Sequence, residues 1–166
     1  MVKMKDIGDF VPEYNELDEQ DISSIQKFTF LWSYFEFKLL GTNASPKKIS
    51  DLVESWYSEG KLDNKIWTHA LDYFKNRYID DGKTNYRFEA LLLRSRDNPK
   101  LVEEVLLGNE KHPVKCFVAT LTIIYRFRNN LFHGMKWQYN IQDQRENFDA
   151  SSCLIGECIS QYKAAE

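Results

Sequence analysis

The spacing of the apolar residues is the strongest constraint on the fold, because they recur at steps of three and four along most of the chain. Such a period gathers apolar side chains on one face of an α-helix, whereas a half-buried strand needs strict alternation. Alternating runs of β-branched residues are almost absent. The sequence therefore predicts an all-α helical bundle.

The first three helices have recognisable ends. Residues 21–40 carry aromatic side chains on several faces, so we expect this helix to be central. Ser45 followed by Pro46 is typical of an N-cap with proline at the first helical position, and it opens the second helix. Asp63 caps the third helix, which ends at the Asp-Asp-Gly of residues 80–82.

The second half of the chain predicts further helices: two short ones whose apolar cores lie within 88–92 and 101–106, a long one from Pro113 to about Gly134, and a last one capped by Asp149 or Ser151. Before the last helix, residues 137–148 are polar and aperiodic, which predicts a loop. No internal repeat and no linker rich in serine or proline divides the chain, so we expect a single domain over residues 1–166.

Composition excludes several classes of protein. The chain has 166 residues, 43% hydrophobic and 14% aromatic, which suits a domain with a sizeable core and excludes disorder and collagen. No apolar run reaches the roughly eighteen residues of a membrane span, and the first residues lack the apolar stretch of a secretory signal. We therefore expect a soluble cytoplasmic protein that has no membrane partner.

Cysteine usage and the missing motifs argue against bound metals and cofactors. Cys116, Cys153 and Cys158 form no Cys-x-x-Cys pair, so we expect them to be reduced, buried and structural. No His-x3-His pair is present, and none of the seven glycines forms a phosphate-binding loop. The sequence thus predicts no metal site and no cofactor.

The charge is unevenly distributed although the net charge is only -3. Residues 111–142 hold five Lys or Arg and no acid, and they include two of the three histidines, His112 and His133. A local positive field of this kind attracts phosphate. The alternative is an acid-free stretch that arose by chance around a buried helix.

The helix that begins at Pro113 has an apolar face and a polar face. At about 100° per residue, one arc is apolar and the other is polar. The apolar arc carries Phe117, Leu121, Ile124, Leu131 and Met135, and the polar arc carries Arg126, Asn129, Asn130 and His133. Arg128 projects within the apolar arc, so it needs an acidic partner, an exit to solvent or a ligand. Glu36 is one candidate partner.

The run IIYRFRNNLFHGMK resembles the signature helix of HEPN domains, in which an arginine and a polar residue precede a histidine by a few positions. Arg128, Asn129 and His133 match that motif, and Gly134 is similar to the residue that usually follows it. The resemblance implies a HEPN-like helical bundle. It is specific over this helix and loose over the rest of the chain.

The spacing of the motif leaves one geometric question open. On a regular helix Arg128 and His133 point about 140° apart, whereas Arg126 and His133 nearly share a face. Either the helix distorts near Asn129, or Arg126 also contributes to the site.

Many HEPN proteins are metal-independent ribonucleases, so the resemblance implies an endoribonuclease that cleaves RNA through attack of its 2′-hydroxyl. His133 would serve as general acid or base, Arg128 would stabilise the phosphorane, and Asn129 would position one of them. The expected RNA contacts come from Arg126, Asn130, Lys136 and Trp137. HEPN proteins typically dimerise, which implies a symmetric homodimer with a composite site.

The resemblance also suggests a toxin or phage-defence effector, with an antitoxin protein as a further partner. Some HEPN toxins carry a tyrosine two residues after the motif histidine as the site of their neutralisation, but Met135 occupies that position here. The alternative function is a non-catalytic module for dimerisation or RNA binding, because inert HEPN domains exist.

Overall fold

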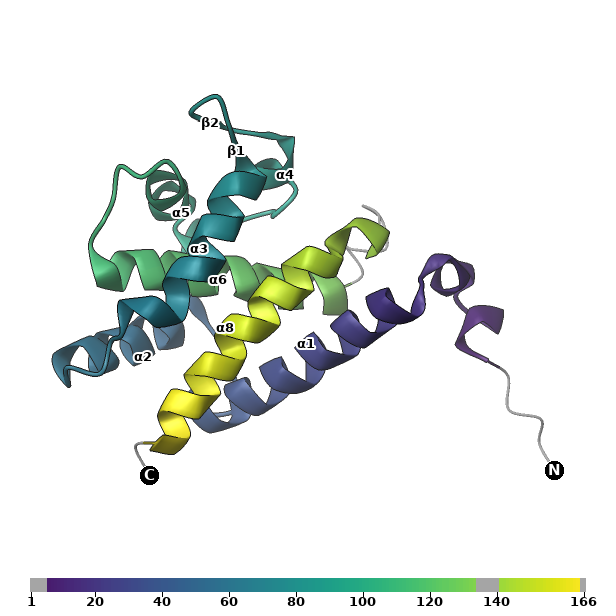
Figure 1. Ribbon diagram of the computed structural model, residues 1–166, viewed down its shortest axis with the longest axis horizontal. Coiled ribbons are helices and arrows are strands. Elements are labelled where there is room, and N and C mark those ends of the chain that lie inside the picture. Colours follow the sequence, from purple (N-terminus) through teal and green to yellow (C-terminus); the bar gives the residue numbers. More distant parts are fainter. Residues whose placement is uncertain (1–5, 134–140, 165–166) are drawn as a thin grey trace.

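The computed structural model describes residues 6–133 and 141–164, and over these residues the chain is all-α, as the apolar spacing predicts (Figure 1). The α-helices are α1 (Glu19–Leu39), α2 (Pro46–Ser58), α3 (Asn64–Tyr78), α4 (Tyr86–Glu89), α5 (Pro99–Leu106), α6 (Pro113–Phe132) and α8 (Arg145–Ala164). The 3-10 turns are η1 (Ile7–Asp9), η2 (Pro12–Glu16), η3 (Ser95–Asp97) and η4 (Ile141–Gln144).

The predicted N-caps of α2 and α3 are confirmed. The Ser45 hydroxyl accepts a hydrogen bond from the backbone N–H of Lys48, and the Asp63 carboxylate accepts one from the N–H of Lys65. Each bond satisfies one of the donors that the first turn of a helix leaves without an intrahelical partner. Local sequence therefore determines where these two helices begin.

Helices α1 and α8 lie side by side and run in the same direction (Figure 1). The ring of Phe28, halfway along α1, packs against the ring of Phe148 near the start of α8, with centroids 5.1 Å apart. Near their ends, the ammonium group of Lys163 lies over the Tyr34 ring. The two helices form one layer of the bundle, in which packing against α8 fixes the position of α1.

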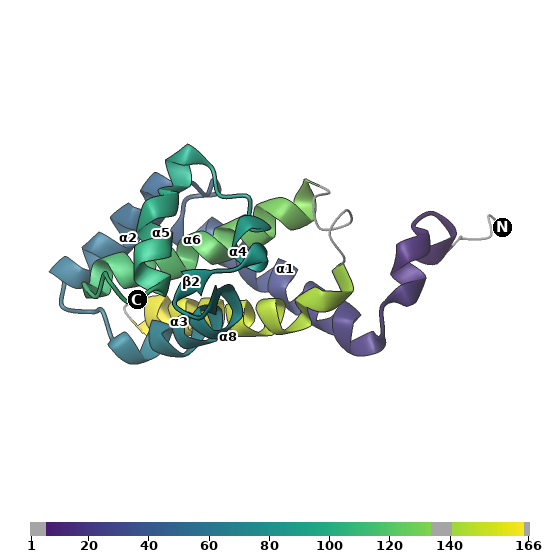
Figure 2. The same cartoon turned by 90° about the horizontal axis from the view of Figure 1, so that it is seen from above.

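Helix α6 crosses the middle of the molecule and packs against α2, α3 and α5 (Figure 1 and Figure 2). The Phe117 ring lies 6.0 Å from Trp56 and 6.3 Å from Trp67 between ring centroids, and both tryptophans are buried. Nearly every residue from Cys116 to Phe127 is buried. This explains why α6 is apolar on all sides until its last two turns.

The start of α8 differs from the sequence-based expectation. The helix begins at Arg145, so Asp149 and Ser151 lie inside it and do not cap it. The Asp149 carboxylate instead accepts a hydrogen bond of 2.7 Å from the Ser24 hydroxyl of α1. Contacts with α1 thus extend the helix into a segment that has no helical period of its own.

Two smaller expectations are also corrected. Residues around the Asp-Asp-Gly turn form a short antiparallel hairpin, β1 (Ile79–Asp80) and β2 (Lys83–Thr84). Its strands have only two residues each, which is too short for an alternating pattern to be recognised in the sequence. Cys116 and Cys158 are buried, but Cys153 is exposed, and all three thiols are free. None of the helices described has both the length and the apolar character needed to cross a membrane.

Candidate functional site

A polar pocket of about 350 Å³ lies beside the last two turns of α6. Four arginines line it, Arg94 and Arg96 at η3 and Arg126 and Arg128 on α6. Asn129 and His133 line it from the end of α6, and Glu36 lines it from α1. We call it the arginine pocket.

The end of α6 answers the question of geometry that the motif spacing leaves open. The helix continues without interruption past Asn129 to Phe132, and His133 is its C-cap, with a backbone N–H that donates to the Asn129 carbonyl. Arg126 and Arg128 both line the pocket together with His133. Two long side chains on different faces therefore reach one pocket, and the helix does not need to distort.

Arg126 is the most deeply buried arginine of the pocket, with 3% of its surface exposed. Its Nη2 donates to Asn130 Oδ1 at 3.1 Å, and its Nη1 lies 3.6 Å from Asp97 Oδ2. Its Nε lies 3.5 Å from the Leu91 carbonyl, which also accepts a hydrogen bond from the Asn130 amide. These contacts fix the guanidinium, but Nη1 has no hydrogen-bond partner.

The electrostatics around Arg126 are unfavourable to its charge. Burial lowers the pKa of Arg126, and the attraction of Asp97 opposes that effect. The neighbouring charges of Arg94 and Arg96 lower the pKa further. An arginine side chain stays protonated in proteins, so Arg126, Arg94 and Arg96 all keep their charges despite this repulsion. The pocket therefore holds an excess of positive charge.

Arg128 pairs with the acid that the sequence suggested. Its Nη2 lies 3.5 Å from Glu36 Oε2, its Nη1 donates to Asn129 Oδ1 at 3.0 Å, and 30% of its side chain is exposed. Glu36 is held in turn by the indole N–H of Trp32 at 3.0 Å and the backbone N–H of Ala44 at 2.8 Å. The guanidinium is oriented from two sides and still reaches the pocket.

Of the remaining predicted site residues, one lines the pocket, one is buried beside it, and two lie outside the described residues. His133 is exposed and lines the pocket. Asn130 is 2% exposed; its side chain accepts a hydrogen bond from Arg126 and donates one to the Leu91 carbonyl. It therefore holds Arg126 in place, whereas the sequence suggested an RNA contact. Lys136 and Trp137 lie outside the described residues, as do Gly134 and Met135.

Sequence reasoning missed Arg94, Arg96 and the buried Asp97. They stand in a segment that the pattern marks only as a break before the Asn98-Pro99 helix start. No local spacing relates this segment to α6, because the contact between Asp97 and Arg126 spans the intervening helix α5 and its loops. An Arg-x-Arg pair in a polar turn was the only available signal.

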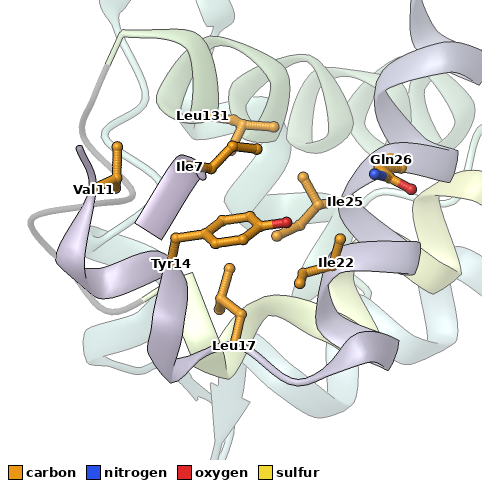
Figure 3. A pocket seen from close by; sticks show the side chains of 8 residues that line it. All are labelled: Ile7, Val11, Tyr14, Leu17, Ile22, Ile25, Gln26 and Leu131. Atoms are coloured by element: carbon orange, nitrogen blue, oxygen red, sulfur yellow. The ribbon is translucent and has the colours of Figure 1, made fainter. Parts of the chain in front are cut away.

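A second pocket, of about 280 Å³, opens between the N-terminal turns and α1 (Figure 3). Its walls are mostly aliphatic, and the Tyr14 hydroxyl and the Gln26 amide are its polar groups. It carries no charged side chain, so it offers neither an acid nor a base of the strength that phosphoryl transfer requires. Of these two pockets, the arginine pocket is therefore the candidate site for chemistry.

No cluster of three or more His, Cys, Asp or Glu suited to a metal ion occurs within residues 6–133 and 141–164. Comparison with known proteins gives no matching family model, no matching curated protein and no matching solved structure. The function is therefore inferred from the pocket itself and from the resemblance of its helix to the HEPN motif.

Proposed function

We propose that this chain is a metal-independent endoribonuclease of the HEPN type, acting on RNA in the cytoplasm. The observation that carries the proposal is the common pocket of Arg128, Asn129 and His133, which has more guanidinium than carboxylate groups. An RNA phosphodiester is the abundant anion that such a pocket suits, and histidine is suited to proton transfer near neutral pH.

The proposed reaction uses the RNA's own nucleophile. A base takes the proton of the 2′-hydroxyl, the 2′-oxygen bonds to the adjacent phosphorus, and the bond from phosphorus to the 5′-oxygen breaks. An acid gives a proton to that leaving oxygen, so the products carry a 2′,3′-cyclic phosphate and a 5′-hydroxyl. His133 acts as the acid or the base in this scheme.

Arg128 is the group that stabilises the charge of the phosphorane. A guanidinium can donate two parallel hydrogen bonds to phosphate oxygens. Its contact with Glu36 is long at 3.5 Å, and its Nε has no hydrogen-bond partner. Asn129 accepts a hydrogen bond from Arg128, which supports a role in positioning the arginine more than the imidazole.

The reaction profits from two proton-transfer groups, but each chain offers a single motif histidine. A symmetric homodimer that brings two arginine pockets together would supply the second. In a toxin or phage-defence effector of this type, an antitoxin protein would block the same pocket or prevent dimer formation. Mixing two inactive variants, Arg128→Ala and His133→Ala, restores part of the cleavage only if one site draws on both chains.

The test is cleavage of a labelled RNA pool by the purified chain in EDTA. We expect fragments that end in 2′,3′-cyclic phosphate, and we expect the same strands made with 2′-deoxy sugars to bind without being cut. Binding of both kinds of strand with no cleavage, at any protein concentration, would favour the non-catalytic RNA-binding module.

A further inference from the structure

We propose that Arg94 and Arg96 form a second phosphate-binding subsite in the arginine pocket, which holds the phosphate next to the one that reacts. The inference rests on the proposed function and adds the substrate class, an RNA strand that presents two adjacent phosphates to one pocket. Neither arginine belongs to the motif that suggested the site.

Arg94 and Arg96 reach the pocket from a different element than the motif residues. They flank Ser95 at the start of η3, both are exposed, and both line the arginine pocket. In the part of the chain that the structure describes, neither forms an ion pair with an acid. Their charges are therefore available to a ligand.

The turn that carries them is fixed to α6. Asp97 Oδ2 accepts the backbone N–H of Arg94 at 2.7 Å, and the Asp97 N–H donates to the Arg94 carbonyl at 2.8 Å. The same carboxylate pairs with Arg126, and its side chain is 0% exposed. A buried carboxylate thus holds the turn against α6, so a phosphate need not order the turn when it binds.

The number of charges in and behind the pocket indicates two phosphates. Its four arginines face two carboxylates, Glu36 and Asp97, which leaves a surplus of two positive charges. Each phosphodiester carries one negative charge, so one scissile phosphate neutralises half of the surplus. Burial is the main cause of the lowered pKa of Arg126, and repulsion by Arg94 and Arg96 adds to it; a bound anion would relieve that repulsion.

The size of the pocket is compatible with this assignment. Its volume of about 350 Å³ is within the range of pockets that enclose small organic ligands. Arg128 and His133 then contact the reacting phosphate, and Arg94 and Arg96 contact its neighbour. A dinucleotide, with its single internal phosphate, fills only half of such a site.

The experiment compares two uncleavable ligands, a 2′-O-methyl dinucleotide with one phosphate and a 2′-O-methyl trinucleotide with two. Their affinities are measured by chemical-shift titration, which detects weak binding. For the wild type we expect the trinucleotide to bind at least about tenfold more tightly. In Arg94→Ala/Arg96→Ala this advantage falls to about twofold, and the slope of log affinity against log salt becomes shallower by about 0.7 for each phosphate that the variant does not neutralise.

Lys65→Ala/Lys100→Ala is the matched control, because it removes two exposed positive charges that do not line the arginine pocket. We expect it to keep the full advantage of the trinucleotide. If the double arginine variant also keeps that advantage, the second subsite is wrong while the proposed ribonuclease is untouched. If the wild type binds neither ligand and cuts no RNA, the proposed function fails and the subsite fails with it.

Discussion

Two regions of the molecule use arginine in opposite ways. At the start of α8, Arg145 donates to Asp21 at 2.8 Å and to Gln20 at 2.7 Å, and it also donates to Asp18. The hydrogen bonds to Asp21 and then to Asp18 raise the pKa of Arg145. In the arginine pocket, burial and like charges lower the pKa of Arg126.

The difference separates an arginine whose donors are all paired from arginines that keep unpaired donors. Every nitrogen of the Arg145 guanidinium has an acceptor, and the three acceptors lie at the start of α1, so this cluster joins α1 to α8. The pocket arginines share two carboxylates and leave donors without acceptors. We infer that surplus guanidinium charge, and not arginine content, marks the functional region.

The largest effect is expected from Arg126→Met, which keeps the apolar stem and removes the charge. The Asp97 carboxylate would remain buried without a counter-ion, so we expect the free energy of unfolding to fall by about 3–5 kcal/mol. Urea denaturation measures this loss. Adding Asp97→Asn, which still accepts the Arg94 N–H, should restore part of the stability; a double variant less stable than the single one would contradict the pairing.

Arg128→Ala should affect catalysis more than stability, because its side chain is partly exposed and its ion pair is long. Removing a group that stabilises the transition state typically lowers kcat about 10²–10³-fold. Rates on labelled RNA measure the loss, and circular dichroism checks that the helices are retained. The matched control is Arg145→Ala, which removes an arginine that has partners throughout and should cleave at the wild-type rate.

Arg145→Ala tests the other side of the comparison. Its interactions are partly exposed, so we expect the Tm to fall by only a few degrees. The fall should shrink at high salt, because exposed ion pairs are screened. Thermal denaturation at low and high salt measures both, and a large loss of RNA cleavage in this variant would remove the distinction between the two regions.

The smallest effect concerns acid stability. The backbone N–H of Asp21, and after it Arg145, lowers the pKa of Asp18 below its usual 3.8. A lowered folded-state pKa contributes stability that is complete above the unfolded-state value and is lost as the pH falls through the folded-state value. The Tm difference between wild type and Asp18→Asn should therefore be constant near neutral pH and diminish below about pH 3.8.

Local signals in the sequence predicted much of the fold, because capping and apolar period act over a few residues. The start of α2 at Pro46 is found in the structure. The pairing of Arg128 with Glu36 is found as well, although it joins α6 to α1, because a charge within an apolar arc requires an acidic partner. The start of α8 was missed because distant Asp18 and Asp21 bind Arg145.

The arginine pocket was predictable on its α6 side and at Glu36 of α1, but not at η3. The resemblance of α6 to the HEPN motif predicted Arg128 and His133, whereas Arg94 and Arg96 reach the pocket through a buried contact between Asp97 and Arg126. A contact of that kind depends on how α5 and α6 pack, and no local pattern encodes it.

The most direct measurement is RNA cleavage in EDTA by His133→Ala beside His69→Ala. Both histidines are exposed, but only His133 lines the arginine pocket. We expect His133→Ala to retain the helical signal of the wild type and to produce no fragments, while His69→Ala cleaves at the wild-type rate. A folded His133→Ala protein that cleaves RNA as fast as the wild type would contradict a catalytic role for the pocket.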